Sequence, residues 1–311
     1  MAASLEESPG EQVPLSASMQ PAKMQPYVIY LVGILMVMNI LNCMDRIAMA
    51  VLMPQIKAEL HLTDAQLGLL VGLAFSLFYA GCGLPIARYA DRGNRVKVMT
   101  ASLVVWSLMT AACGAAQNFW HLLLARMGLG AGEAGAMPAS SSIITQLVPY
   151  DRRSSVFAIT TFGGVLGGGL GIALAGWLGP LIGWRWTFVA LGAPGLLMAV
   201  LVKFSLREPP ANVVQQEAEP APISLKADLG TLWNCRSYRR IVIFLVSAGF
   251  ISGSHQQWFA SFYSRSHGLT SHEIGTWLAL ASGLGAVVGL FGGGWITDRA
   301  ARRDIRLPYV I

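Results

Sequence analysis

Eight apolar segments, each long enough to cross the hydrocarbon core of a bilayer as a helix, constrain the fold of this chain more than any other feature. Only 12% of the 311 residues are charged and 54% are hydrophobic, whereas a soluble domain is about one quarter charged. Because such segments satisfy their own backbone groups in lipid only as helices, the sequence predicts an all-α membrane protein built as a helical bundle. The predicted spans are residues 27–53, 66–89, 97–116, 120–146, 155–178, 184–204, 239–263 and 272–296.

The polar segments around these spans divide the chain into four predicted parts. Residues 1–26 are polar and acidic and lack the basic start of a secretory signal, so we expect a disordered cytoplasmic tail. Residues 27–204 hold six spans and form a predicted N-terminal lobe, and residues 205–238, rich in Pro and Glu at their start, form a cytoplasmic linker. Residues 239–311 begin a C-terminal lobe with the seventh and eighth spans and the start of a ninth.

An internal repeat indicates how the two lobes are related. HLTDAQLG at 61–68 aligns with GLTSHEIG at 268–275, and ARYADRGNR at 87–95 aligns with GWITDRAAR at 294–302, both at an offset of 207 residues. Six spans separate the copies, so the copies run in the same direction through the membrane. The predicted layout is two parallel lobes of six spans, a plan typical of transporters. Since the second lobe stops after two full spans, we expect the sequence to be a fragment of a longer chain.

The positive charges lie mainly on one side of the predicted membrane. Seventeen of the 22 Lys and Arg residues fall in the tail, the linker and the loops of the same side, against three on the opposite side. Because basic loops are retained in the cytoplasm, we predict a multi-pass protein of the cell membrane with a cytoplasmic N-terminus. This topology accounts for the net charge of +6, so no nucleic-acid partner is expected.

Residue spacing indicates neither a metal site nor an enzyme. The four cysteines are scattered without metal or redox spacing, so no metal or cofactor is expected. Ser140, Ser141 and Ser142 lie in the fourth span with no His in the same segment, which argues against nucleophilic catalysis. The glycine-rich stretch 163–171 lies within the fifth span, where we expect close helix packing at a rocking interface and no nucleotide loop.

Four charged residues lie deep within the predicted spans, away from their ends: Asp45 and Arg46 in the first, Arg126 and Glu133 in the fourth. Facing lipid, each would cost a few kcal/mol, so all four are expected to face the interior of the bundle at overlapping depths. One hypothesis is a structural network that holds the two spans together. The other is a site that exchanges protons for substrate, with Asp45 and Glu133 as proton carriers and Arg46 and Arg126 as ligands of an anionic group.

The seventh span carries the sequence SHQQW, which is too polar for a face in contact with lipid. His255, Gln256, Gln257 and Trp258 are therefore predicted to line the cavity from the C-terminal lobe and to contact the substrate head group. A lone histidine is also compatible with a packing role, so both readings of His255 stay open.

With these motifs in view, the sequence resembles the major facilitator superfamily. DRGNR at 91–95 and the weaker copy DRAAR at 298–302 are similar to the loop motif of that family. NCMDR at 42–46 and RMGLGAGE at 126–133 are similar to motifs of its first and fourth spans. The asparagine in the first loop motif and GAGEA at 130–134 resemble the spinster-like branch in particular.

The resemblance implies a monomeric secondary active transporter that is proton-coupled and works by alternating access. Its implied substrate is a small anionic or amphiphilic molecule of the lysolipid or sphingoid type. The alternatives are an anion:cation symporter for sugar acids or other carboxylates, and a non-transporting sensor of the same fold. The loop motif implies a latch between conformations, formed by Asp91, Arg92, Arg95, Asp298, Arg299 and Arg302.

Overall fold

The computed structural model describes residues 25–208, 230 and 232–301, and the secondary structure of this part is entirely helical. The prediction of an all-α bundle is therefore confirmed. The elements are α1 (Pro26–Leu60), α2 (Asp64–Gly68), the π-helical turn η1 (Leu69–Leu73), α3 (Ala74–Arg92), α4 (Arg95–Gly114), α5 (Phe119–Glu133), α6 (Ala136–Leu147), the short 3-10 turn η2 (Tyr150–Arg152), α7 (Arg153–Ser205), α10 (Arg236–His267) and α11 (Ser271–Ala301).

Local capping residues begin several of these helices. Thr63 and Gln66 form the predicted capping box at the start of α2, in which the side chain of each residue bonds to the backbone N–H of the other. The side chain of Asn94 accepts from the backbone N–H of Lys97 at the start of α4, at 2.7 Å. Asn118 caps α5 in the same way.

Three irregularities interrupt the predicted spans. The second span contains the π-helical turn η1, and the fourth span breaks between α5 and α6. The fifth and sixth spans together form α7, in which Gly183 makes the turn with a φ of 79°. Because a side chain strongly disfavours positive φ, glycine suits this turn.

The N-terminal lobe is held together by close contact between α1 and the first half of α7. Gly163, Gly167 and Gly171 recur every four residues and therefore share one face of α7. A Cβ atom at any of them would collide with a backbone carbonyl of α1. The expected close packing is present, but its partner lies in the same lobe. The small-residue contact between lobes is made instead by Gly176 of α7 and Gly275 of α11.

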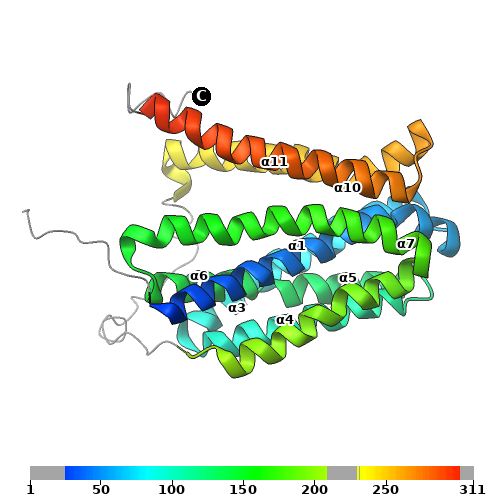
Figure 1. Ribbon diagram of the computed structural model, residues 1–311. Coiled ribbons are helices and arrows are strands. Elements are labelled where there is room, and N and C mark those ends of the chain that lie inside the picture. Colours follow the sequence, from blue (N-terminus) through cyan, green and yellow to red (C-terminus); the bar gives the residue numbers. More distant parts are fainter. Residues whose placement is uncertain (1–24, 209–229, 231, 302–311) are drawn as a thin grey trace, which may run out of the picture.

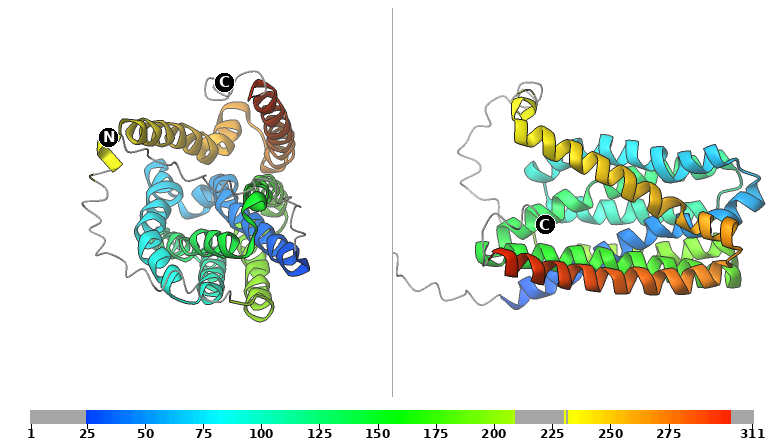
Figure 2. Two further views of the ribbon diagram at one scale, coloured as in Figure 1. Left: turned by 90° about the vertical axis from the view of Figure 1, so that its left-hand side faces the viewer. Right: turned by 90° about the horizontal axis from the view of Figure 1, so that it is seen from above.

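Helices α10 and α11 cross one flank of the N-terminal lobe and meet at their shared turn (Figure 1, Figure 2). This turn, residues 268–270, lies at the same end of the molecule as the turn at 61–63, and we call it the contact end. Here Trp177 Nε1 donates to Thr276 Oγ1 at 3.0 Å, and Ser261 Oγ donates to Met53 Sδ at 3.4 Å. The lobes are therefore joined at the contact end.

Four stretches of the described chain are long and apolar enough to cross a membrane, and the 53-residue α7 holds two spans joined at Gly183. The outward faces of these helices present large apolar side chains such as Leu77, Leu181 and Leu197. Such continuous apolar surface fits a lipid environment.

Candidate functional site: a charged cavity between the lobes

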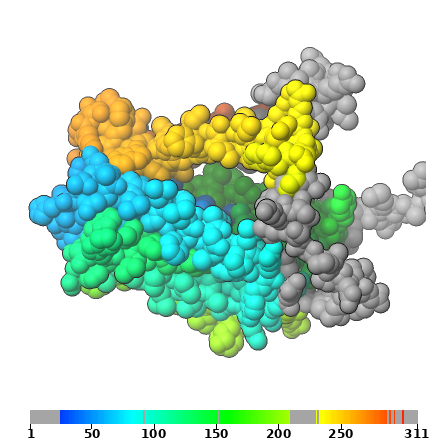
Figure 3. All heavy atoms as spheres, turned by 180° about the vertical axis from the view of Figure 1, so that it is seen from behind, coloured from blue at the N-terminus to red at the C-terminus, as the bar shows by residue number. Residues whose placement is uncertain are grey.

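A cavity of about 910 Å³ lies between the N-terminal lobe and the helices α10 and α11. Figure 3 shows the hollow between α10 and the α3–α4 side of the lobe, with α7 visible at its base. Its lining combines a few polar groups with a larger apolar wall, the composition usual for small-molecule sites. The polar residues include Asn42, Arg46, Glu133, Thr161, His255 and Gln256, and the apolar ones include Leu35, Met38, Ile144, Phe157, Ile172 and Phe259.

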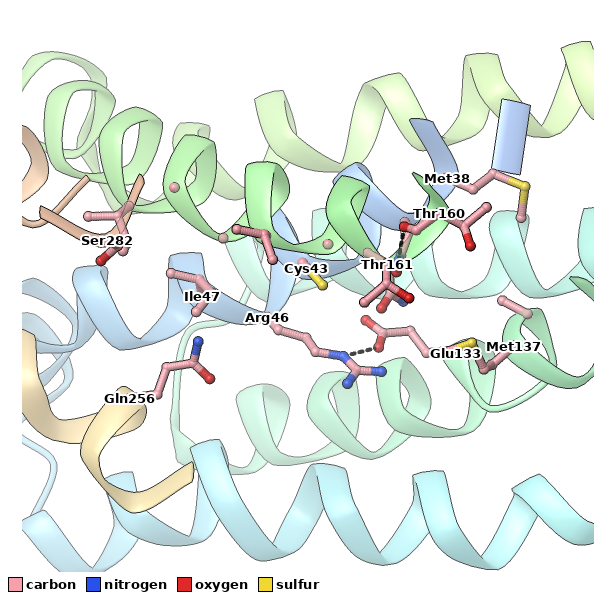
Figure 4. Close-up of a pocket in the computed structure, with 18 of the residues that line it drawn as sticks. Met38, Cys43, Arg46, Ile47, Glu133, Met137, Thr160, Thr161, Gln256 and Ser282 are labelled. Atoms are coloured by element: carbon pink, nitrogen blue, oxygen red, sulfur yellow. Dashed lines mark hydrogen bonds and ion pairs between the residues drawn. The ribbon is translucent and has the colours of Figure 1, made fainter. Parts of the chain in front are cut away.

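An ion pair between Arg46 of α1 and Glu133 of α5 forms the charged part of this lining (Figure 4). Arg46 Nε lies 2.5 Å from Glu133 Oε2. The arginine side chain is 32% exposed, whereas the glutamate side chain is fully buried. The second carboxylate oxygen, Oε1, has no hydrogen-bond partner among the described residues. The pair is thus reachable from the cavity through its arginine.

Two aromatic rings of α3 support this arginine. The guanidinium carbon of Arg46 lies 4.8 Å from the ring centroid of Phe75 and 4.8 Å from that of Tyr79. The two rings stack on each other with their centroids 5.6 Å apart. Both distances to Arg46 fall within the range of a cation–π contact.

The other predicted charges, Asp45 and Arg126, lie behind the cavity and do not line it. Asp45 is 2% exposed and Arg126 is 1% exposed. Asp45 Oδ2 accepts a hydrogen bond from the hydroxyl of Thr110 in α4 at 3.1 Å. Arg126 Nε donates to the backbone carbonyl of Leu70 at 3.2 Å. That carbonyl belongs to η1, and π-helical turns of this kind are frequent at functional sites.

The predicted residues of the seventh span divide in the same way. His255 and Gln256 of α10 line the cavity, and Gln256 points into it (Figure 4). Gln257 Oε1 is buried without a partner among the described residues. Trp258 lies against Gly68 of α2, outside the cavity. The structure therefore brings His255 and Gln256 together with the ion pair, and it does not bring Gln257 and Trp258 there.

Of the predicted latch, Arg95 is the residue whose contacts are seen. Its Nε donates to the hydroxyl of Ser142 at 2.7 Å, and its Nη1 lies 3.3 Å from Glu208 Oε1. Glu208 also accepts from the backbone N–H of Val96 at 2.9 Å. These contacts join Arg95 to α6 and to the segment that directly follows α7, so none of them reaches the C-terminal lobe. Arg299 lies near the end of α11; the side chains of Asp91, Arg92 and Asp298 are outside the described part, as is the whole of Arg302.

An ion pair between the lobes was not predicted from the sequence. At the contact end, Asp64 of α2 accepts two bonds from Arg265 of α10, at 3.0 and 2.6 Å, and a third from Lys57 of α1 at 2.7 Å. The carboxylate of Asp64 raises the pKa of Arg265 above its ordinary value. Asp64 and Arg265 flank the repeated Leu-Thr turns. Their position relative to the internal repeat could therefore have indicated a contact between the lobes.

Phe75 and Tyr79 were also missed. Their spacing of four residues places them on one face of a helix, but aromatic residues in an apolar span give no sign by themselves of a charged neighbour. Thr110 escaped notice for a similar reason, because its role is visible only beside Asp45.

Comparison with known proteins agrees with this architecture. The profile of the Major Facilitator Superfamily matches residues 35–311. An MFS-type efflux pump of Mycolicibacterium smegmatis is 33% identical over 278 residues, which cover 88% of this chain and 63% of the pump. Human protein spinster homolog 1 is 29% identical over 243 residues, covering 76% of this chain and 46% of that protein.

A crystal structure of a bacterial homolog of the human lysosomal transporter Spinster, in an inward-facing and unoccupied conformation, superposes with a TM-score of 0.73. It is 32% identical and covers 90% of this chain and 64% of its own. The chain thus spans less than two thirds of the length of these relatives. The family and its fold are those of membrane transporters and not of enzymes. The chain belongs to the major facilitator superfamily, as a spinster-like member.

Proposed function

We propose that the protein is a proton-coupled secondary transporter that moves a small anionic or amphiphilic substrate by alternating access. The observation that carries the proposal is the Arg46–Glu133 ion pair, which opens onto a cavity of about 910 Å³ between two lobes. A buried carboxylate whose ion-pair partner can be drawn to a ligand is suited to bind a proton when that ligand binds.

The proposed coupling uses this geometry. When Glu133 binds a proton, its attraction for Arg46 falls, and the guanidinium becomes free for a carboxylate or phosphate in the cavity. When the proton leaves, the carboxylate competes with the substrate for the same guanidinium. Gln256 and His255 would contact the polar head from the facing lobe, and the apolar wall would receive a hydrocarbon portion.

We assign Asp45 and Arg126, which are buried behind the cavity, a supporting role in proton coupling. Their burial supports a role for Asp45 as a second proton position and for Arg126 as its balancing charge. A direct contact of Arg126 with substrate would need a rearrangement around Phe75, over which its guanidinium lies at 5.2 Å. Gln257 and Trp258 would act on the substrate only through their helix, α10.

The orientation of the protein is part of the proposal. With the N-terminus in the cytoplasm of the cell, the contact end lies outside and the described conformation faces inward. The inward-facing structure of the bacterial Spinster homolog supports this assignment. In that state Arg95 is held by Ser142 and Glu208 within its own lobe, and the loop motif would latch the lobes together in the outward-facing state.

The test is uptake into proteoliposomes driven by a pH gradient, with lysophospholipids, sphingoid phosphates and sugar acids offered in parallel. Glu133→Gln mimics the protonated acid, so pH-driven accumulation should fall at least about tenfold while substrate exchange without a gradient continues. Glu273→Gln, which changes an exposed carboxylate in the first turn of α11, is the matched control and should keep normal accumulation.

Normal pH-driven accumulation in both Glu133→Gln and Asp45→Asn would contradict the proton site. Binding without any flux would indicate the sensor. Uptake of sugar acids but not of lipids would place the protein with the anion symporters, and the reverse would support the amphiphilic substrate.

A further inference from the structure

Arg46 rests on aromatic rings as well as on its carboxylate partner. Its guanidinium lies over both Phe75 and Tyr79, two stacked rings one helical turn apart on α3. Phe75 is 8% exposed, and Tyr79 lines the cavity. The rings come from a third helix, so they stay in place whether or not Arg46 is paired with Glu133.

Protonation of Glu133 creates a problem that these rings can solve. An arginine that loses its carboxylate partner in a partly buried site is left as a less compensated charge, which disfavours that state. The face of an aromatic ring is negative, so it attracts a cation and repels an anion. Against the intact pair the two effects partly cancel, whereas against Arg46 alone only the attraction remains.

We propose that Phe75 and Tyr79 are positioning residues that form an aromatic rest for Arg46 and thereby favour proton uptake by Glu133. The proposal rests on the proton-coupled function proposed above and assigns it two further residues. The rings would then hold the guanidinium of Arg46 at the cavity, where it is available to the substrate and is not drawn to another carboxylate.

The ring of Phe75 also contacts the second arginine of the site. Arg126 lies over Phe75 at 5.2 Å, so this one ring contacts both guanidiniums. Arg126 is held by its bond to the carbonyl of Leu70, five residues before Phe75 on the same span. Phe75 is therefore shared by Arg46, which lines the cavity, and Arg126, which is buried behind it.

Other ionisable groups surround Glu133 and bear on any pH response. They come from α1, α3, α4, α5 and α10, whereas the residues of α6, α7 and α11 that line the cavity are not ionisable. They are Cys43, Asp45 and Arg46 of α1, Tyr79 of α3, Cys113 of α4, Arg126 of α5 itself, and His255 of α10.

The test compares the pH of half-maximal flux in the full-length protein with those of three variants. Tyr79→Leu and Phe75→Leu remove a ring and should shift this pH toward acid by about half a unit to one unit. Tyr79→Phe keeps the ring and should retain the original midpoint, which separates the effect of the ring from that of the hydroxyl. A merely structural role would lower flux at every pH without moving the midpoint.

The outcomes distinguish this proposal from the proton-coupled function on which it rests. If flux depends on pH but the midpoint is unshifted in both leucine variants, the role of the aromatic rings is overturned and the proton-coupled function stands. A Tyr79→Phe midpoint that moves as far as that of Tyr79→Leu assigns the effect to the hydroxyl and also overturns it. Wild-type flux that does not depend on pH overturns both proposals together.

Discussion

Asp45 and Arg46 are neighbours on α1, yet they have different surroundings. Successive residues of a helix point about 100° apart, so one side chain can reach a neighbouring helix while the next reaches a cavity. Asp45 points to α4, where the hydroxyl of Thr110 donates to it, and its second oxygen has no partner in the described part of the chain. That single donor is therefore the main polar support of a buried carboxylate.

Removing this donor should destabilise the protein. Thr110→Val keeps the shape of the side chain and leaves Asp45 without its hydrogen bond, so we expect a loss of about 1–3 kcal/mol in the free energy of unfolding. Thermal unfolding in detergent measures the loss. Thr100→Val is the matched control on the same helix, because the hydroxyl of Thr100 donates to the carbonyl of Val96 within α4. Equal losses in the two variants would show that the contact with Asp45 contributes nothing.

The sequence could predict that the four intramembrane charges face the interior, because lipid exposure is too costly. It could not predict how they divide between cavity and core. That division depends on how α1 is rotated against α4 and α5, and on the support from Phe75 and Tyr79. In an apolar span, aromatic residues beside an arginine look the same in sequence as aromatic residues beside lipid. The pairing of Arg46 with Glu133 depends on how α1 and α5 pack in the folded bundle.

At the scale of the elements, α7 uses its glycines in two ways. One face carries Gly163, Gly167 and Gly171 against the carbonyl groups of α1, while Gly168, on the cavity side, has open space where a Cβ would stand. Small residues allow this backbone contact, which is the usual basis of helix association in membranes. A glycine run in a span thus predicts close packing, but the run alone does not identify the partner helix.

A pair of alanine substitutions should separate the two faces. Gly167→Ala places a methyl group against the carbonyl of Ile40, so we expect α1 and α7 to be forced apart and the free energy of unfolding to fall by about 1–3 kcal/mol. Gly168→Ala meets no neighbour and gains helix propensity, so its stability should be unchanged or slightly higher. Thermal unfolding in detergent compares the two. A Gly167→Ala variant as stable as Gly168→Ala would refute the assigned packing.

The elements themselves were largely predictable. The first, second, third, fifth and sixth spans are long apolar stretches, and capping residues such as Thr63 and Asn94 stand where the helices begin. The π-helical turn in the second span and the break between α5 and α6 were not predicted. Apolar periodicity cannot distinguish a π turn from an α turn over so few residues. Tertiary contacts hold the turn, since Arg126 from a different helix binds its Leu70 carbonyl.

At the scale of the whole molecule, the lobes are joined at one end. Asp64 of the N-terminal lobe binds Arg265 of α10 through both carboxylate oxygens, and Lys57 binds the same carboxylate from within the N-terminal lobe. Glycine contact between α7 and α11 and the bond from Trp177 to Thr276 lie at the same end. In the alternating access proposed above this end would have to open, so its contacts would set the balance between the two conformations.

Breaking the bond between the lobes should shift that balance, whereas breaking its neighbour should not. In Arg265→Gln the carboxylate keeps Lys57 but loses its link to α10, so the open form of the contact end should gain about two- to fivefold in population. Lys57→Gln removes a charge from the same carboxylate without cutting the link, and it serves as the matched control. Spin labels on Ala65→Cys and Ser266→Cys, exposed positions in the two lobes, report the distance distribution. The Asp64–Arg265 ion pair would be irrelevant to conformation if Arg265→Gln left that distribution unchanged or if Lys57→Gln altered it equally.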